Sequence, residues 1–181
     1  MRMRVRVWAS QSFWGFALAC VFNAAVQAAD TSVIQNLIDA AQPGDTVNLP
    51  AGTYAGDTLL LNKPIVLVGA EDSSGNPATI LDGEGQREVI DIEVLPVQPL
   101  DSIAVFRLSS IAVVNGYNDG SSMPAPPRSG AGGGIRISTR GSCQSAGSPM
   151  EYMALYLSNC RVENCTAPFG GGIGSTDYSF P

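Results

Sequence analysis

Apolar residues recur with two different spacings along this chain, and the change of spacing separates the predicted elements. Between residues 32 and 42 they follow the i, i+3, i+4, i+7 period of an amphipathic helix. From residue 46 onward they occur in short runs broken by Gly, Pro, Asn and Asp, which is typical of β-strands separated by turns. The pattern therefore predicts one helix followed by a series of strands.

The predicted helix has a start signal and a stop signal. Ser32 and Gln35 have the spacing of a capping box, and Pro43-Gly44 ends the helical pattern. The apolar face consists of Ile34, Leu37, Ile38 and Ala41. Because a helix with one apolar face must bury it, we expect this helix to cover the rest of the domain.

The apolar runs that follow have the length and composition of strands. They span residues 46–54, 58–64, 65–71, 78–85, 89–94, 103–116, 132–138 and 155–165. Alternation is clearest in residues 89–94, where Ile90, Ile92 and Val94 alternate with Val89, Asp91 and Glu93. No second helical pattern interrupts these runs, so the predicted fold class is all-β.

A long internal repeat organises the strands. Residues 106–116 (FRLSSIAVVNG) align with residues 155–165 (LYLSNCRVENC) at an offset of 49, and each copy leads into its own G-G-G-I, at an offset of 38. The difference is absorbed by a Pro-, Gly- and Ser-rich insertion at 117–130, and a second insertion at 139–149 lengthens the repeat afterwards. Strands preserved between variable turns predict a solenoid, with the glycines where each coil bends into its next strand.

The glycine motif has a second interpretation, a phosphate-binding loop. That interpretation needs Lys and Ser or Thr after the glycines and then a helix. Here Ile135-Arg136-Ile137 continues as a strand pattern, so we favour the scaffold.

Three polar positions of the repeat invite a functional interpretation. Asn115 and Asn164 occupy equivalent places and are expected to be turn residues rather than ligand contacts. Cys160 stands where the earlier copy has Ile111, which favours a small core residue over a disulfide partner. Residues 164–166 match a glycosylation sequon by pattern alone.

The N-terminus has the pattern of an export signal. Arginines at positions 2, 4 and 6 precede a short apolar stretch that ends in small residues. This predicts a signal peptide over 1–28 and a mature domain over 29–181. The stretch is shorter than the roughly 20 residues that span a bilayer, which disfavours a membrane anchor, and lipidation at Cys20 is a further alternative.

Charge and composition exclude several functions. Without the three leader arginines, seven basic residues face sixteen acidic ones, and the net charge falls from −6 to −9. This disfavours nucleic acid and anionic lipid as partners. The absence of histidine excludes Ser-His-Asp and Cys-His catalysis and His-ligated zinc. Cys143, Cys160 and Cys165 are an odd number in the mature chain, so their pairing stays open.

Several segments together carry a family resemblance. They are IQNLIDAAQPGDTVNLPAGTY, KPIVLVGA, TILDGEG and the L-S-N-C-x-V-x-N-C…G-G-G-I pattern. The mature chain resembles the pectin-lyase-like right-handed parallel β-helix superfamily, and is similar to secreted bacterial β-helix repeat proteins and the repeats of polymorphic outer membrane proteins. The resemblance implies a right-handed parallel β-helix with an N-terminal capping helix, in a protein that is secreted or held at the cell surface or outer membrane.

The sequence stops at STDYSFP, directly after the second G-G-G-I. A solenoid needs a cap or a continuation at each end. The pattern therefore predicts the N-terminal part of a longer protein, and the alternative is a naturally short chain that covers its open end by self-association or with a partner.

Two classes of function fit these patterns. The first is a non-catalytic, adhesin-like or carbohydrate-contacting β-helix, which needs no cofactor. The alternative is a polysaccharide lyase acting on uronate polymers, in which carboxylate-bound Ca²⁺ and an Arg or Lys base drive β-elimination. Outward carboxylates at Asp91 and Glu93 and outward arginines at Arg107, Arg136 and Arg161 could meet in a cleft, but are expected mainly to keep the surface hydrated. No catalytic or metal-binding residue is assigned.

Overall fold

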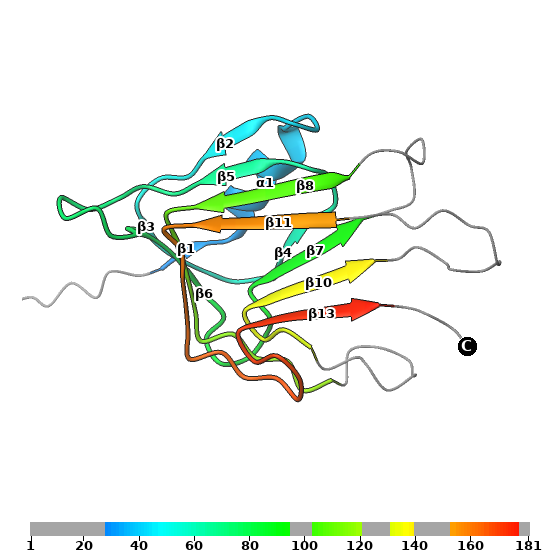
Figure 1. Ribbon diagram of the computed structural model, residues 1–181. Helices are drawn as coiled ribbons and strands as arrows, with labels where there is room; N and C mark the ends of the chain where they lie inside the picture. The colour runs from blue at the N-terminus through cyan, green and yellow to red at the C-terminus, as the bar shows by residue number, and fades with distance from the viewer. Residues whose placement is uncertain (1–27, 95–102, 121–130, 140–152, 178–181) are drawn as a thin grey trace, which may run out of the picture.

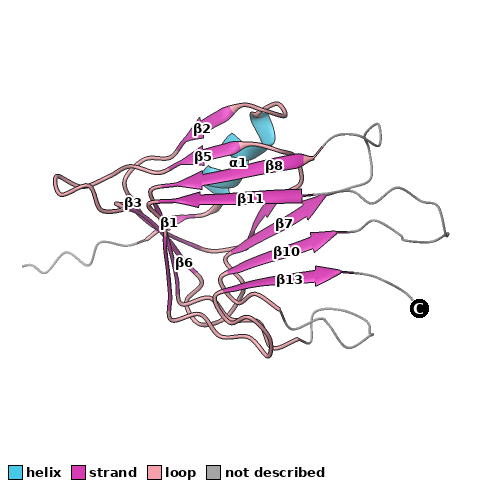
Figure 2. Cartoon of the chain, in the orientation of Figure 1, coloured by secondary structure: helices cyan, strands magenta, loops and turns pink. Residues whose placement is uncertain are grey.

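The computed structural model describes residues 28–94, 103–120, 131–139 and 153–177. It consists of parallel β-strands with a single helix, α1 (Ser32–Ala40), among the described residues (Figures 1 and 2). The predicted all-β class is confirmed, and the architecture is solenoid-like because successive strands pass in turn through three parallel sheets. The predicted signal peptide and most of both predicted insertions lie outside the described residues.

Four coils of three strands build the stack, preceded by the short β1 (Ala29–Asp30). Coil 1 contains β2 (Thr46–Asn48), β3 (Gly52–Ala55) and β4 (Leu59–Leu61); coil 2 contains β5 (Val66–Val68), β6 (Thr79–Asp82) and β7 (Ile90–Val94). Coil 3 contains β8 (Ala104–Ser109), β9 (Ile111–Val114) and β10 (Ile135–Thr139); coil 4 contains β11 (Met153–Ser158), β12 (Arg161–Glu163) and β13 (Ile173–Asp177). Sheet I is β1-β3-β6-β9-β12, sheet II is β4-β7-β10-β13, and sheet III is β2-β5-β8-β11.

The strand register reproduces both offsets of the sequence repeat. Leu157 pairs with Leu108 and Val162 with Val113, each 49 residues apart. Ile173 pairs with Ile135, 38 residues apart. The alignment predicted from the repeat is therefore the actual pairing of coil 4 with coil 3.

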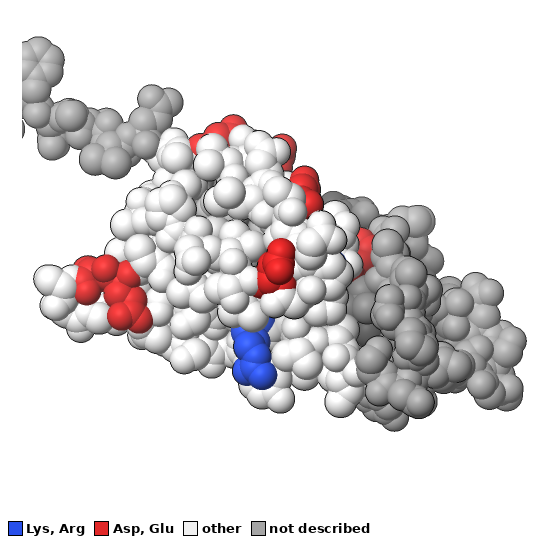
Figure 3. Space-filling view, turned by 90° about the horizontal axis from the view of Figure 1, so that it is seen from above, with Lys and Arg blue, Asp and Glu red and all other residues white. Residues whose placement is uncertain are grey.

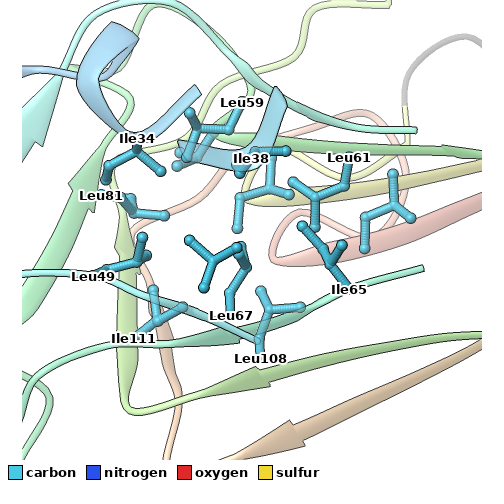
Figure 4. Close-up of a cluster of buried hydrophobic side chains, with 14 of the residues drawn as sticks. Ile34, Ile38, Leu49, Leu59, Leu61, Ile65, Leu67, Leu81, Leu108 and Ile111 are labelled. Carbon is cyan, nitrogen blue, oxygen red and sulfur yellow. The ribbon is translucent and has the colours of Figure 1, made fainter. Parts of the chain in front are cut away.

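The core lies between the three sheets and consists mainly of aliphatic side chains stacked from coil to coil, together with the aromatic rings of Tyr54 and Phe106 (Figure 4). Ile90 and Ile92 of β7 are fully buried, as the alternation predicts. Val89, expected on the outer side, is only 4% exposed because it precedes β7 and lies in the turn, where strand alternation does not apply.

Helix α1 closes one end of the stack. Ile34 and Ile38 are fully buried against the core, whereas Leu37, predicted on the apolar face, is 41% exposed. The side-chain amide of Gln35 bonds to both backbone groups of Leu60, accepting from its N–H at 2.9 Å and donating to its carbonyl at 3.2 Å. These bonds occupy polar groups on the outer edge of β4, which has no further strand beside it.

The predicted capping box is wrong. The residue preceding the helix is Thr31, and its hydroxyl donates to the carbonyl of Asp57 at 2.8 Å instead of capping the helix. The Ser32 N–H donates to Asp30 Oδ1 at 2.7 Å. The Gln35 side chain does not bond to the helix start, because its amide bonds to the backbone of Leu60 at the edge of β4.

Candidate functional site

A largely buried ionic cluster lies on the outer face of sheet II. We call it the sheet II cluster; it consists of Glu88, Asp91, Asn118 and Arg136. Asp91 and Arg136 are register partners in β7 and β10, so parallel pairing places their side chains side by side. The cluster therefore links coil 2 to coil 3.

Arg136 is held by two carboxylates. Its Nε donates to Asp91 Oδ1 at 3.1 Å, Nη2 bonds to Asp91 Oδ2, and the same Nη2 lies 3.1 Å from Glu88 Oε1. Arg136 and Asp91 are only 8% and 6% exposed. Two carboxylates against one guanidinium leave an excess negative charge in a place with little water.

The surroundings of Glu88 change the pKa of its carboxyl group. Burial raises the pKa of Glu88 from 4.5 to about 7; Asp91 adds to the rise, while Arg136 and the Asn118 amide oppose it. Asn118 Nδ2 donates to Glu88 Oε2 at 3.2 Å and to the Ala131 carbonyl at 3.3 Å. The cluster can therefore gain or lose one proton close to neutral pH.

The structure separates the three arginines predicted to point outward. Arg136 lies on sheet II, Arg107 on sheet III and Arg161 on sheet I. Of the predicted site residues, Asp91 and Arg136 meet. The expectation that these outward charges are hydrated is wrong for this pair, because both side chains are buried and bonded to each other.

The outer face of sheet III presents an accessible cation and an aromatic ring. The guanidinium of Arg107 lies 4.5 Å from the centre of the Tyr156 ring, and the two residues are register partners in β8 and β11. Tyr156 is 52% exposed, and Arg107 is also exposed. This pair can contact a ligand without displacing any part of the core.

Two polar ladders follow the corners of the solenoid. At the corner between sheets III and I, the Ser110 hydroxyl donates to Glu71 Oε1 at 2.5 Å and Asn159 Nδ2 donates to the same oxygen at 2.9 Å. These two bonds lower the pKa of the Glu71 carboxyl. Ser110 and Asn159 have φ values of 56° and 49°, so this ladder stabilises an unusual turn in two successive coils.

The second ladder confirms the turn role predicted for Asn115 and Asn164. Their φ values are 52° and 53°, in the left-handed region that Asn tolerates. Asn115 Nδ2 donates to Asp82 Oδ1 at 3.0 Å, so the ladder continues into coil 2. Sequence analysis missed the first ladder, although the aligned L-S-S and L-S-N triplets marked its place.

The glycine motif is part of the scaffold. Gly132 and Gly170, each three residues before the start of β10 and β13, have φ values of 73° and 56°. A Cβ on Gly133 would lie 2.3 Å from the Thr166 carbonyl oxygen. Glycine is therefore required by a left-handed turn and by close contact between coils.

The cysteines of coil 4 are free thiols. Cys160 packs against the core, as predicted from its alignment with Ile111, and its thiol donates to the Leu108 carbonyl at 3.4 Å. Cys165 Sγ accepts the N–H of Gly116 at 3.4 Å, and burial raises the pKa of its thiol. Cys143 lies outside the described residues.

The surface is predominantly uncharged, with separated acidic patches and one basic patch on the face shown in Figure 3. Within the described ranges, no three His, Cys, Asp or Glu side chains are grouped so as to hold a metal ion. In the same ranges, no helix is long and apolar enough to cross a membrane.

Comparisons of the chain with protein-family models, curated proteins and solved structures yield no match.

Proposed function

We propose that this chain is an exported, non-catalytic right-handed parallel β-helix protein that contacts polysaccharide or another cell-surface ligand along the outside of its coils. The basic, apolar and small-residue order of residues 1–28 supports export. The in-register coils and the capping helix support the likeness to the pectin-lyase-like superfamily. The destination is the cell surface, the outer membrane or the medium.

The exposed pair of Arg107 and Tyr156 carries this proposal. A tyrosine ring can stack on the apolar face of a sugar, and a neighbouring guanidinium can bind its hydroxyl or carboxylate oxygens. The pair lies on a sheet face built from regular strands, which suits an extended ligand. The sheet II cluster has a structural role in this proposal, because its charged groups bind one another.

Binding measurements on a panel of neutral and uronate-containing polysaccharides test the proposal. Arg107→Ala and Tyr156→Ala should each weaken binding of the preferred polymer by about fivefold or more. Val33→Ala is the matched control, since Val33 is 51% exposed but lies on α1. Equal affinity of all variants, or no binding by the unaltered protein, would contradict the proposed contact.

The same incubations test the lyase alternative. A lyase would release unsaturated uronides, detected by ultraviolet absorbance, and chelation of Ca²⁺ would stop the release. Such release would overturn the non-catalytic proposal. Among the described residues no specific observation favours this alternative, because Arg136, which lies between Glu88 and Asp91, is bound by both carboxylates.

A further inference from the structure

Helix α1 has a second apolar face, which the core does not cover. Val33 and Leu37 are one turn apart and are 51% and 41% exposed, and Ala40 on the next turn is exposed as well. The core is contacted by a different face, which carries the fully buried Ile34 and Ile38 (Figure 4). The cap of a solenoid ordinarily has a polar outer face, so this exposed apolar surface needs a cover. We call Val33, Leu37 and Ala40 the α1 stripe.

Negative charge gathers beside the α1 stripe. The exposed carboxylates in or next to the helix belong to Asp30, Asp39, Asp45 and Asp57. Asp30 Oδ1 accepts the Ser32 N–H where the helix begins, and Asp45 Oδ2 accepts the Gln42 N–H just after it ends. Lys63 Nζ donates to a carbonyl of the last helical turn at 2.9 Å. Four aspartates and this one lysine give the surroundings of α1 a net charge of −3.

The first 28 residues of the chain have the complementary composition, and we call them the leader. They contain Arg2, Arg4 and Arg6 and no Asp, Glu or Lys, so their side chains carry a net charge of +3. An apolar stretch at 13–26 follows the arginines. The leader therefore offers apolar side chains for the α1 stripe and guanidinium groups for the carboxylates beside it.

The point of attachment brings the leader close to this surface. The leader continues directly into β1 at Ala29, and α1 begins at Ser32. The nine residues of α1 span about 14 Å at about 1.5 Å per residue, a length that the apolar stretch of the leader covers in any conformation. A short tether raises the effective concentration of the leader to about millimolar, so even a weak contact is populated.

We propose that the leader, as long as it is attached, binds the α1 stripe with its apolar stretch and the neighbouring aspartates with its arginines. A second copy of the chain fits this surface less well, because it would bring two ends with a net charge of −3 together. Removal of the leader uncovers the stripe, so the precursor and the processed chain differ in the apolar surface that they expose at this end. The proposal does not depend on the ligand contact on sheet III.

Tryptophan fluorescence of the full chain tests the contact directly. Trp8 and Trp14 are the two tryptophans of the chain, and both belong to the leader, so their emission reports on the leader alone. In the full chain purified with its leader intact, we expect emission at a shorter wavelength than that of a synthetic peptide of residues 1–28. Leu37→Lys should shift the emission toward that of the peptide and increase quenching by acrylamide. Ile103→Lys is the matched control, since Ile103 is 58% exposed and lies outside α1, and it should leave the emission unchanged.

A charge variant tests the second part of the contact. Asp57→Lys reverses one of the charges beside α1 and should shift the tryptophan emission in the same direction as Leu37→Lys. Glu163→Lys is an equal charge change in coil 4 and should have no effect. Circular dichroism establishes that the variants stay folded.

Three results would overturn the proposal. The first is emission of the full chain that equals that of the free peptide. The second is a short-wavelength emission that both Leu37→Lys and Asp57→Lys leave unchanged. The third is an emission that moves to longer wavelength on dilution, which would show that the leader contacts another molecule instead of its own α1.

Discussion

Arg136 and Asp91 are 45 residues apart in the chain, yet they form a bidentate ion pair. Arg136 Nε donates to Asp91 Oδ1 at 3.1 Å, and Arg136 Nη2 donates to Asp91 Oδ2. Glu88 shares the same guanidinium. Because Arg136 comes from coil 3 and both carboxylates from coil 2, the pair joins successive coils by side chains as well as by the backbone ladder.

Removal of this arginine should strongly destabilise the fold. Arg136→Leu leaves two buried carboxylates without their shared cation, and we expect a loss of about 3–5 kcal/mol in the free energy of unfolding, measured by urea titration. Arg161→Leu is the matched control, since its ion pair is exposed and should contribute less than about 1 kcal/mol. Similar losses in the two variants would contradict a structural role for the cluster.

Glu88 should make stability depend on pH. Its pKa is raised from 4.5 to about 7, so the folded state binds more protons than the unfolded state between these values. The stabilisation is fully present below about pH 4.5 and is lost as the pH rises through about 7. In Glu88→Gln this decrease should vanish, as measured by thermal unfolding across that range; an unchanged slope would assign the effect to another group.

Two glycines of the G-G-G-I motifs, Gly133 and Gly172, should differ in their tolerance of alanine. Gly133→Ala places a methyl group 2.3 Å from the Thr166 carbonyl oxygen, and we expect a loss of about 1–3 kcal/mol. In Gly172→Ala the nearest atom is Val162 Cγ1 at 3.4 Å, an ordinary contact, so this variant should be close to neutral. Urea unfolding of both proteins provides the comparison, and equal stability would argue against close contact between the coils at Gly133.

Asn115 should tolerate glycine better than alanine. Alanine loses the bond to Asp82 Oδ1 and must also adopt a φ of 52°, which costs an L-residue about 1–2 kcal/mol. Glycine loses the bond but adopts this φ without strain. Asn115→Gly should therefore unfold at a higher temperature than Asn115→Ala, and the reverse order would exclude backbone strain as the reason for asparagine.

The sequence predicted the repeating elements well because they depend on local patterns. The offset of 49 between the repeats gave the pairing of Leu108 with Leu157, and the alternation in residues 89–94 gave the inward direction of Ile90 and Ile92. These properties depend only on which residue follows which along a strand.

Features that join distant segments could not be predicted in the same way. The capping box failed because Gln35 bonds to Leu60, a partner 25 residues away. The contact of Arg136 with Asp91 depends on the register across the insertion at 117–130, where the repeat loses its constant spacing. The pKa of Glu88 is raised because its side chain is largely buried, and the residues beside it in the sequence do not indicate that burial.

Helix α1 covers coil 1, so the stability of the stack should differ from one end of its axis to the other. Strand pairing joins each coil only to the coils directly beside it, so local opening should cost least in coil 4 and most near the helix. Amide hydrogen exchange would then slow progressively from β12 through β9 and β6 to β3, a gradient of protection along a single sheet. In a chain of this kind, the anchored end sets which coils persist when the others fray.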